Sequence, residues 1–481
     1  MTSVTDIPLI RPSDARSWSL CARRVWLDNK GDLELPPVTD EFDLLIIQLG
    51  LEHESAVLQH LANTRDVHTA TSPEDTKRLI TEGVQVIYQA QLVDEANGFI
   101  GYPDFLIRHE SGEYQPADAK LSLNEEKKEI QVQLGFYRRM LGSQLPAIVF
   151  LGDGNEAVIG DEANVMTNRF VTEMRELLAN DDEPVVRYGH SKCCICPYYT
   201  HCKPAFEAKE ELSLLYGIQA RAASGLENEG IDTITKLAET DPITISDIPY
   251  LKGSEKKQRA VLQAKSYLSG KVFQTAPISL PEGQWVHFDI EDNPLADNVQ
   301  RHVYLWGFLV PGYSNENFEY VWTDTELDDE QGWLEFLARI EDYRKRYTPL
   351  ILAHYSNYER TTIRAYAKRY GMQNNSTVKY LLGETSPLFD MRKPVLDNLV
   401  LPLQGYGLKD ICKHKDLVNF QWEDDESGSQ WSIVQFNHFL AESDPKIKET
   451  LKSDILGYNR DDVIATRRLE EWLRSNFITP Y

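Results

Sequence analysis

The sequence has 481 residues, 42% of them hydrophobic, and 50 lysines and arginines against 75 aspartates and glutamates give it a net charge of −25 at pH 7. A chain of this length exceeds a single hydrophobic core, so we expect two large domains or three smaller ones. No apolar segment is long enough to span a membrane, and the first residues lack a signal-peptide pattern, so we expect a cytoplasmic protein without a membrane partner. The acidic balance argues against general charge-driven binding of nucleic acid. An enzyme of this charge that acts on polynucleotides would need local basic patches and metal ions to hold phosphate.

The first predicted elements are helices. Their periodicity places one over residues 13–28, one over 39–61 and one over 72–90. Cys21 lies in the first and is either a small core residue or a metal ligand supplied from a distance. His53 lies in the second and is either a surface histidine or a ligand of a metal held elsewhere.

The stretch 101–120 predicts a β-hairpin, because two apolar runs flank a Glu-Ser-Gly turn. Asp104 enters the first strand, while Asp118 and Lys120 are two residues apart on the second and therefore share a face. Two carboxylates this close suit Mg²⁺ or Mn²⁺, and Lys120 could orient a metal-bound water or offset charge on phosphorus. The pattern resembles the PD-(D/E)xK nuclease core. The alternative is a solvated strand face with a salt bridge.

A helix is predicted next over residues 123–140, with Gln133 and Tyr137 four apart on one face. That face either packs in the ordinary way or lies across the metal site, where Gln133 and Tyr137 would touch a substrate strand. Two further strands and a helix ending near Leu178 complete an α/β sheet.

Four cysteines follow within ten residues. Cys193-x2-Cys196-x5-Cys202 supplies three thiolates, and a tetrahedral site needs a fourth, which Cys21 can provide. Cys194 could replace Cys193 as a ligand. From spacing alone, zinc is an alternative to an iron–sulfur cluster.

Taken in order, these elements resemble RecB-like nucleases with an iron–sulfur staple, a group that includes the CRISPR-associated RecB-like exonucleases and the AddB-type helicase–nucleases. The motifs are Cys21-Ala-Arg-Arg, Gly50-Leu-Glu-His53, Pro103-Asp104, Asp118-Ala-Lys120, Gln133-x3-Tyr137 and the late cysteines. The resemblance implies metal-dependent cleavage of single-stranded DNA and suggests a helicase or a repair or defence protein as partner. The implied ligands of a [4Fe–4S] cluster are Cys21, Cys193, Cys196 and Cys202.

Residues 209–274 read as a helical connector. Leu226 to Ala238 resembles a helix-hairpin-helix element, whose backbone amides can bind phosphate, although Glu227 and Glu229 beside its turn make a structural connector the alternative. We therefore expect three domains, at 1–208, 209–274 and 275–481.

From Gln284 the order of strands and helices is that of an RNase H-like sheet. Asp289 and Glu291 share a face of its first strand, and Tyr458 and Asp462 are one turn apart on the last predicted helix. Acids so placed can converge on two metal ions that stabilise the attacking and leaving oxygens of an in-line displacement.

These residues resemble the DEDD exonucleases of the DnaQ-like group, in the subtype with a tyrosine that positions the water. The resemblance assigns Asp289 and Glu291 to the first motif and Tyr458 and Asp462 to the last. Glu359 stands where the group normally has an aspartate, with Asp390 as a fallback ligand.

The sequence therefore predicts an α/β protein with a PD-(D/E)xK domain, a helical connector and an RNase H-like domain. The predicted activity is Mg²⁺- or Mn²⁺-dependent nuclease action, as an exonuclease on single-stranded or frayed DNA rather than RNA. One alternative is a catalytically degenerate iron–sulfur protein that binds nucleic acid or assists assembly. Another is an RNA exonuclease that works through the C-terminal domain only.

Overall fold

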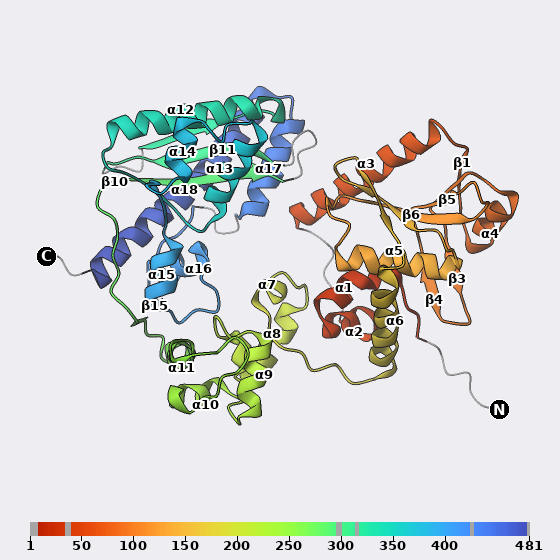
Figure 1. Ribbon diagram of the computed structural model, residues 1–481, viewed down its shortest axis with the longest axis horizontal. Coiled ribbons are helices and arrows are strands. Elements are labelled where there is room, and N and C mark those ends of the chain that lie inside the picture. Colours follow the sequence, from red (N-terminus) through yellow and green to blue (C-terminus); the bar gives the residue numbers. More distant parts are fainter. Residues whose placement is uncertain (1–7, 34–39, 295–300, 313–316, 424–427, 479–481) are drawn as a thin grey trace. The chain divides into compact units, whose positions relative to one another are not determined.

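The computed structural model describes residues 8–33, 40–294, 301–312, 317–423 and 428–478. The chain divides into two compact units, Met1–Val186 and Arg187–Tyr481 (Figure 1). The division falls before the cysteine segment, which groups with the second unit. Among the described residues, no helix is both long and apolar enough to cross a bilayer.

The first unit is built on a six-stranded sheet in the order β1-β2-β5-β6-β7-β8. The predicted hairpin forms as β5 and β6, which pair antiparallel, and β6 then pairs parallel with β7. Helices α5 and α3 cover opposite faces of the sheet (Figure 1), because Leu134 packs against Leu106 on one face and Val57 packs against Phe105 on the other. The strands are β1 (Val67–Thr69), β2 (Val86–Tyr88), β5 (Phe105–Arg108), β6 (Tyr114–Lys120), β7 (Ala147–Leu151) and β8 (Glu156–Ile159), with a separate hairpin of β3 (Leu92–Asp94) and β4 (Phe99–Gly101).

Two of the helices predicted for this unit differ from the structure. The single helix expected over 13–28 is broken at Cys21, whose backbone is extended with φ −163° and ψ 127°. The helix expected over 72–90 ends at Glu82, because Gly83 adopts a left-handed φ of 74° and strand β2 follows. The helices of the unit are α1 (Ala15–Leu20), α2 (Ala22–Lys30), α3 (Glu41–Ala62), α4 (Pro73–Glu82), α5 (Lys128–Leu141) and α6 (Ala163–Ala179).

The second unit begins with short helices, and those after residue 209 lie in the segment predicted to be helical. In the segment that resembles a helix-hairpin-helix element, Gly230 has a φ of 82° between α9 and α10. Glu227 beside this turn forms an ion pair with Arg187, which also binds Glu211. This pairing favours a structural role for the acid. The helices are α7 (His190–Cys193), α8 (Tyr199–Ala208), α9 (Ala220–Asn228), α10 (Ile234–Glu239) and α11 (Ser254–Ser269).

The rest of the second unit is organised around a five-stranded sheet in the order β12-β11-β10-β13-β14. Strand β11 pairs antiparallel with both β10 and β12, whereas β13 pairs parallel with both β10 and β14. The strands are β10 (Gln284–Asn293), β11 (His302–Leu309), β12 (Phe318–Trp322), β13 (Leu350–His354) and β14 (Leu388–Asp390).

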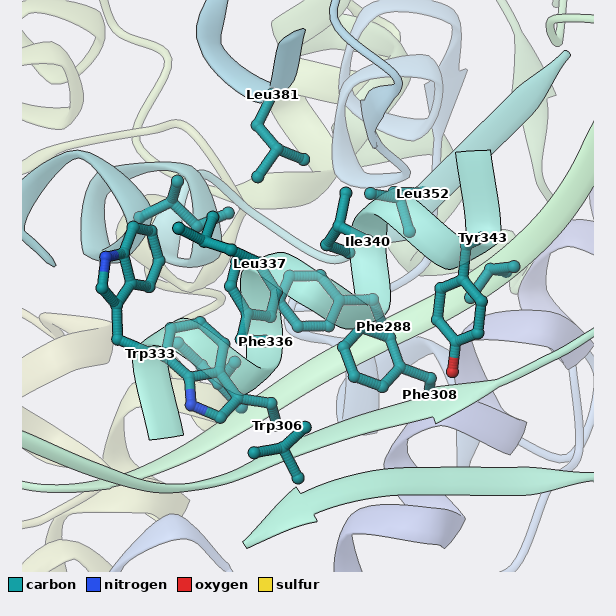
Figure 2. Packing of buried hydrophobic residues seen from close by; sticks show 14 of the residues in the cluster. Phe288, Trp306, Phe308, Trp333, Phe336, Leu337, Ile340, Tyr343, Leu352 and Leu381 are labelled. Atoms are coloured by element: carbon teal, nitrogen blue, oxygen red, sulfur yellow. The ribbon is translucent and has the colours of Figure 1, made fainter. Parts of the chain in front are cut away.

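Aromatic side chains fill the layer between this sheet and helix α12 (Asp329–Arg346) (Figure 2). Phe288 and Phe308 from the strands stack near Phe336 of α12, and Trp306 lies 4.1 Å from the ring of Phe336. Helices α13 (Tyr358–Arg369) and α14 (Ser376–Leu382) contribute to the same core.

The other face of the sheet is covered by α17 (Ser429–Ala441) and α18 (Pro445–Phe477), with Phe436 stacked on Tyr304. Helix α18 begins at Pro445 because Asp444 caps the amide of Lys446. The remaining elements are β9 (Phe273–Gln274), α15 (Arg392–Asn398), β15 (Leu399–Val400), α16 (Leu408–Cys412) and 3₁₀ turns at Pro12–Asp14, Leu212–Leu214, Pro242–Thr244 and Glu326–Asp328.

Candidate metal centre

Three carboxylates converge at one end of the second sheet. Asp289 and Glu291 alternate along β10, and Asp462 comes from the middle of α18, which packs across β10 and β11. One oxygen from each lies within 4.8 Å of the others, and among the described residues this is the group of three potential ligands with that spacing. Hard divalent cations take such oxygens as ligands.

Asn459 supports two of these acids from α18. Its Nδ2 donates to Asp289 Oδ2 at 2.9 Å and to Glu291 Oε1 at 3.2 Å. The amide fits because Gly307, which faces Asp289 across the β10–β11 register, has no side chain; a Cβ there would overlap Asn459 Oδ1. The glycine and the asparagine therefore act as a matched pair that holds the two carboxylates.

The electrostatics of the three carboxylates favour a bound cation. Burial, and then repulsion from Asp462, raise the pKa of Glu291 to about 8. Burial, and then Glu291, raise the pKa of Asp289 well above its ordinary range. The pKa of Asp462 is raised by burial, although Lys409 opposes the rise. Because these acids repel and are poorly hydrated, a bound divalent ion is the natural replacement for their protons.

Asp462 is oriented by neighbours from other segments. Trp422 Nε1 donates to Asp462 Oδ1 at 2.7 Å, and a hydrogen bond from Tyr458 lowers the pKa of the same carboxyl. Lys409 Nζ lies 4.9 Å from the centre of the Tyr458 ring and 5.3 Å from that of Trp422. Burial raises the pKa of Tyr458 far above its usual range, so its hydroxyl stays protonated.

Glu359 is the acid that the sequence places where an aspartate is usual. It is the second residue of α13, is 2% exposed, and its Oε2 lies 3.0 Å from His354 Nδ1. Burial raises its pKa and His354 opposes the rise. Asp390, the fallback ligand, instead accepts the backbone N–H groups of Ser356 and Arg392, each at 2.9 Å, and serves as a structural acid.

All of these acids except Asp390 open on one cleft of about 610 Å³. Its walls come from β10, the start of α13, α16 and α18. The lining residues include Asp289, Glu291, Asp292, Arg301, Tyr355, Tyr358, Glu359, Lys409, Asp410, Ile433, Tyr458 and Asp462. The cleft is therefore anionic, with Arg301 and Lys409 as the cations among its described lining residues.

The first unit brings Asp104, Asp118 and Lys120 together. The Asp104 amide donates to Asp118 Oδ1 at 3.0 Å, and the Ala119 amide donates to Asp104 Oδ2 at 2.8 Å. Lys120 Nζ lies 3.0 Å from Oδ2 of the fully buried Asp118. Burial, and then the Asp118 charge, raise the pKa of Asp104 to about 8.

The structure shows the contacts of the other residues predicted around this hairpin. His53 Nε2 donates to the backbone carbonyl of Phe150 at 3.0 Å, and His53 does not form a ligand group with Asp104 and Asp118 in the described part of the chain.

Tyr137 is 2% exposed, packs in the core and donates to the carbonyl of Tyr102 at 3.1 Å. Gln133 Nε2 donates to the Tyr137 hydroxyl at 3.1 Å. A side chain this buried supports the backbone at Tyr102, and contact of Gln133 and Tyr137 with a substrate strand stays a prediction.

The cysteines are divided between the units. Cys21 belongs to the first, while the four cysteines from Cys193 to Cys202 lie along α7, the following turn and α8 of the second. Cys194 is exposed, with Sγ 3.6 Å from the Tyr188 hydroxyl. The four-cysteine cluster stays a prediction, and its three later members are Cys193, Cys196 and Cys202.

Sequence reasoning missed Asn459, Trp422 and Lys409. Asn459 lies between Tyr458 and Asp462, and Lys409 ends the stretch Gly405-Tyr-Gly-Leu-Lys409, but residue type and spacing alone assign neither of them a role. Trp422 gives no sequence signal, because its contact with Asp462 exists only in the fold.

Comparison with known proteins bears on the second unit. Residues 286–474 match the family model described as the RNase_H superfamily. This part of the chain is an RNase H-like domain, a fold that generally forms metal-dependent nucleases, and the match spans all three converging acids. No curated protein matches the chain significantly.

Among solved structures, the chain matches the crystal structure of SSO0001. The two share 15% sequence identity over 42% of this chain and 89% of that one, with a TM-score of 0.21. A score this low supports no conclusion about the fold.

Proposed function

We propose that the protein is a metal-dependent nuclease that hydrolyses phosphodiester bonds in the cleft of its RNase H-like domain. The observation that carries this proposal is the convergence of Asp289, Glu291 and Asp462 within 4.8 Å. Mg²⁺ or Mn²⁺ held there would stabilise the attacking and leaving oxygens of the displacement.

The chain's own side chains have distinct tasks in this reaction. Asp289, Glu291 and Asp462 hold the cations, and Asn459 fixes the first two of them. The Tyr458 hydroxyl, which stays protonated and donates to Asp462, is suited to accept a hydrogen bond from the attacking water and so orient it. Glu359 is the candidate fourth acid, and its pairing with His354 holds it at the cleft.

We extend the proposal to a second hydrolytic site at Asp104, Asp118 and Lys120, and to single-stranded or frayed DNA ends as the substrate of an exonuclease. The resemblance of the motif set to RecB-like nucleases supports this. So does the compact arrangement of two acids and one ammonium, in which Lys120 lies 3.0 Å from Asp118.

The proposed cofactor of the cysteine segment is a [4Fe–4S] cluster, with zinc as the alternative. The spacing of the cysteines supports it. Cys193 Sγ also accepts the backbone N–H of Gly189 at 3.4 Å, a type of contact that tunes cluster thiolates.

The test measures cleavage of three substrates in Mg²⁺ or Mn²⁺: single-stranded DNA, a frayed duplex and RNA. Each substrate is labelled at one end or the other. We expect wild type to cut, Asp289→Asn to remove one cleavage activity and Lys120→Ala to remove another. Matched controls are Asp342→Asn and Lys128→Ala, exposed residues of the same types that belong to neither proposed site. The proposal fails if wild type shows no metal-dependent cleavage. Cleavage of RNA alone, unaffected by Lys120→Ala, would restrict the activity to the RNase H-like domain.

A further inference from the structure

Beside the three acids, the cleft carries an aromatic side chain and a cation that the catalytic scheme does not use. Tyr358 begins α13 directly before Glu359, and Arg301 directly precedes β11. Both line the cleft, yet Tyr358 is 37% exposed and the Arg301 side chain 39%. Groups this accessible are available to a ligand.

The two side chains are held in one arrangement by Asp292. The Tyr358 hydroxyl donates to Asp292 Oδ2 at 2.7 Å, and Arg301 Nε lies 2.9 Å from the same oxygen. Arg301 also donates to the Tyr358 hydroxyl, and its guanidinium lies 5.1 Å from the ring centre. Asp292 faces the cleft with Glu291 because β10 has a bulge between them, and a bulge re-aims a strand side chain.

The backbone before Tyr358 is also fixed. Ser356 has a φ of 94°, which is strained for a residue with a side chain, and Asp390 holds its amide at 2.9 Å. The Ser356 hydroxyl then accepts the Tyr358 amide at 3.2 Å. The ring is therefore presented to the cleft by a turn that the surrounding structure maintains.

An exposed ring next to a guanidinium suits one class of ligand. Unpaired bases stack on aromatic side chains and on arginine planes, whereas paired bases in a duplex do not offer their faces. The guanidinium also supplies positive charge for the phosphate of the same nucleotide.

We propose that Tyr358 and Arg301, held by Asp292, bind the unpaired base of the nucleotide next to the phosphodiester bond that is cut. This inference rests on the proposed function, and it adds a subsite that selects single-stranded ends. The arrangement is matched elsewhere in the unit by Tyr380, whose ring has Arg344 at 4.4 Å but does not line the cleft.

The experiment measures the dissociation constant of fluorescein-labelled single-stranded DNA by anisotropy, using full-length protein with Asp289→Asn and Lys120→Ala together to prevent turnover at both proposed sites. Tyr358→Leu should raise the constant about tenfold, within the range expected for loss of one base–aromatic stack. Tyr358→Phe keeps the ring and should retain most of the binding. Tyr380→Leu is the matched control and should leave the constant near that of the parent.

A second DNA strand series tests whether the ring recognises a base. Two strands are compared with the intact strand, one with an abasic residue at its 5′ end and one with an abasic residue at its 3′ end. One of the two should bind more weakly than the intact strand, by about the same factor as Tyr358→Leu weakens binding. Combining that strand with Tyr358→Leu should add no further loss, because the contact is already absent.

The subsite would be overturned if the losses of affinity from Tyr358→Leu and from the abasic strand multiplied when the two are combined. It would also be overturned if Tyr380→Leu weakened binding as much as Tyr358→Leu. Cleavage by wild type decides the proposed function separately, since the binding cycle involves no turnover.

Discussion

The substitution Gly307→Ala tests how the RNase H-like site is held together. Gly307 lies on β11 opposite Asp289, and a Cβ there would overlap Asn459 Oδ1 and lie 3.1 Å from Phe318 Cε2. Asn459 is fully buried, so it cannot turn into solvent. The new methyl group must therefore displace the amide or push the strand from the helix.

The two responses differ in cost. Overpacking a tight core costs about 1–3 kcal/mol. Turning the amide away loses two hydrogen bonds to acids, each worth about 1.5–3 kcal/mol when the acid is charged. The cheaper response sets the loss, so we expect Gly307→Ala to lower the free energy of unfolding by about 2 kcal/mol. Displacement of Asp289 and Glu291 by even about 1 Å should lower hydrolysis by about a hundredfold.

The assay is urea denaturation for stability, together with cleavage in a Lys120→Ala background so that only the RNase H-like site contributes. The matched control is Gly457→Ala on α18, where a Cβ would meet no atom within 4 Å. It should stabilise the helix by about 0.5–1 kcal/mol.

Adding Asn459→Ala removes the overlapping atom. Gly307→Ala should then cost no further stability beyond that of Asn459→Ala, and activity should stay low. Unchanged stability and cleavage in Gly307→Ala would refute the reasoning.

Three further expectations follow from the same geometry. Trp422→Phe keeps an aromatic side chain but removes the 2.7 Å hydrogen bond to Asp462, so cleavage and metal affinity at this site should fall about tenfold, as checked by titration with Mn²⁺; unchanged affinity would contradict this. The pKa of Glu291 is raised from 4.5 to about 8, so the metal-free fold should lose stability as the pH rises between these values, because the unfolded chain releases its proton first. Mg²⁺ or Mn²⁺ should reverse that loss in scanning calorimetry, and a flat pH profile without metal would argue against it. Anaerobically purified protein should be brown, and its broad visible absorbance should vanish in Cys196→Ala but persist in Cys412→Ala, a core thiol outside the predicted set; a colourless protein with stoichiometric zinc would favour the alternative metal.

Local pattern was sufficient for much of the fold. The hairpin of β5 and β6 forms where it was predicted, because alternation and turn residues act over a few neighbours. The break at Cys21 and the early end of α4 were not predicted. The first depends on how the flanking segments pack, and the second on Gly83 taking a left-handed conformation in place of a helical one.

Some residues of the candidate site could also be predicted from the sequence, and others could not. Asp289, Glu291 and Asp462 could be named because each acid sits in a recognisable short motif. Asn459 could not, because its role depends on contacts to residues 170 and 168 positions earlier in the chain. Tyr137 shows the converse: helical spacing identifies a shared face but does not say whether that face meets solvent or the core.

The charge of the protein and the charge of its cleft raise the same physical problem. Under the proposed function, a chain with net charge −25 must hold a polyanion in a cleft whose acids have raised pKa values, including Glu291 at about 8. Divalent cations would solve it, because they replace the protons and turn a repulsive site into an attractive one. Arg301 and Lys409 supply the fixed positive charge of the described lining. Strand binding in this cleft should therefore be coupled to metal binding, and the accessible Tyr358 ring supplies a contact that does not depend on charge.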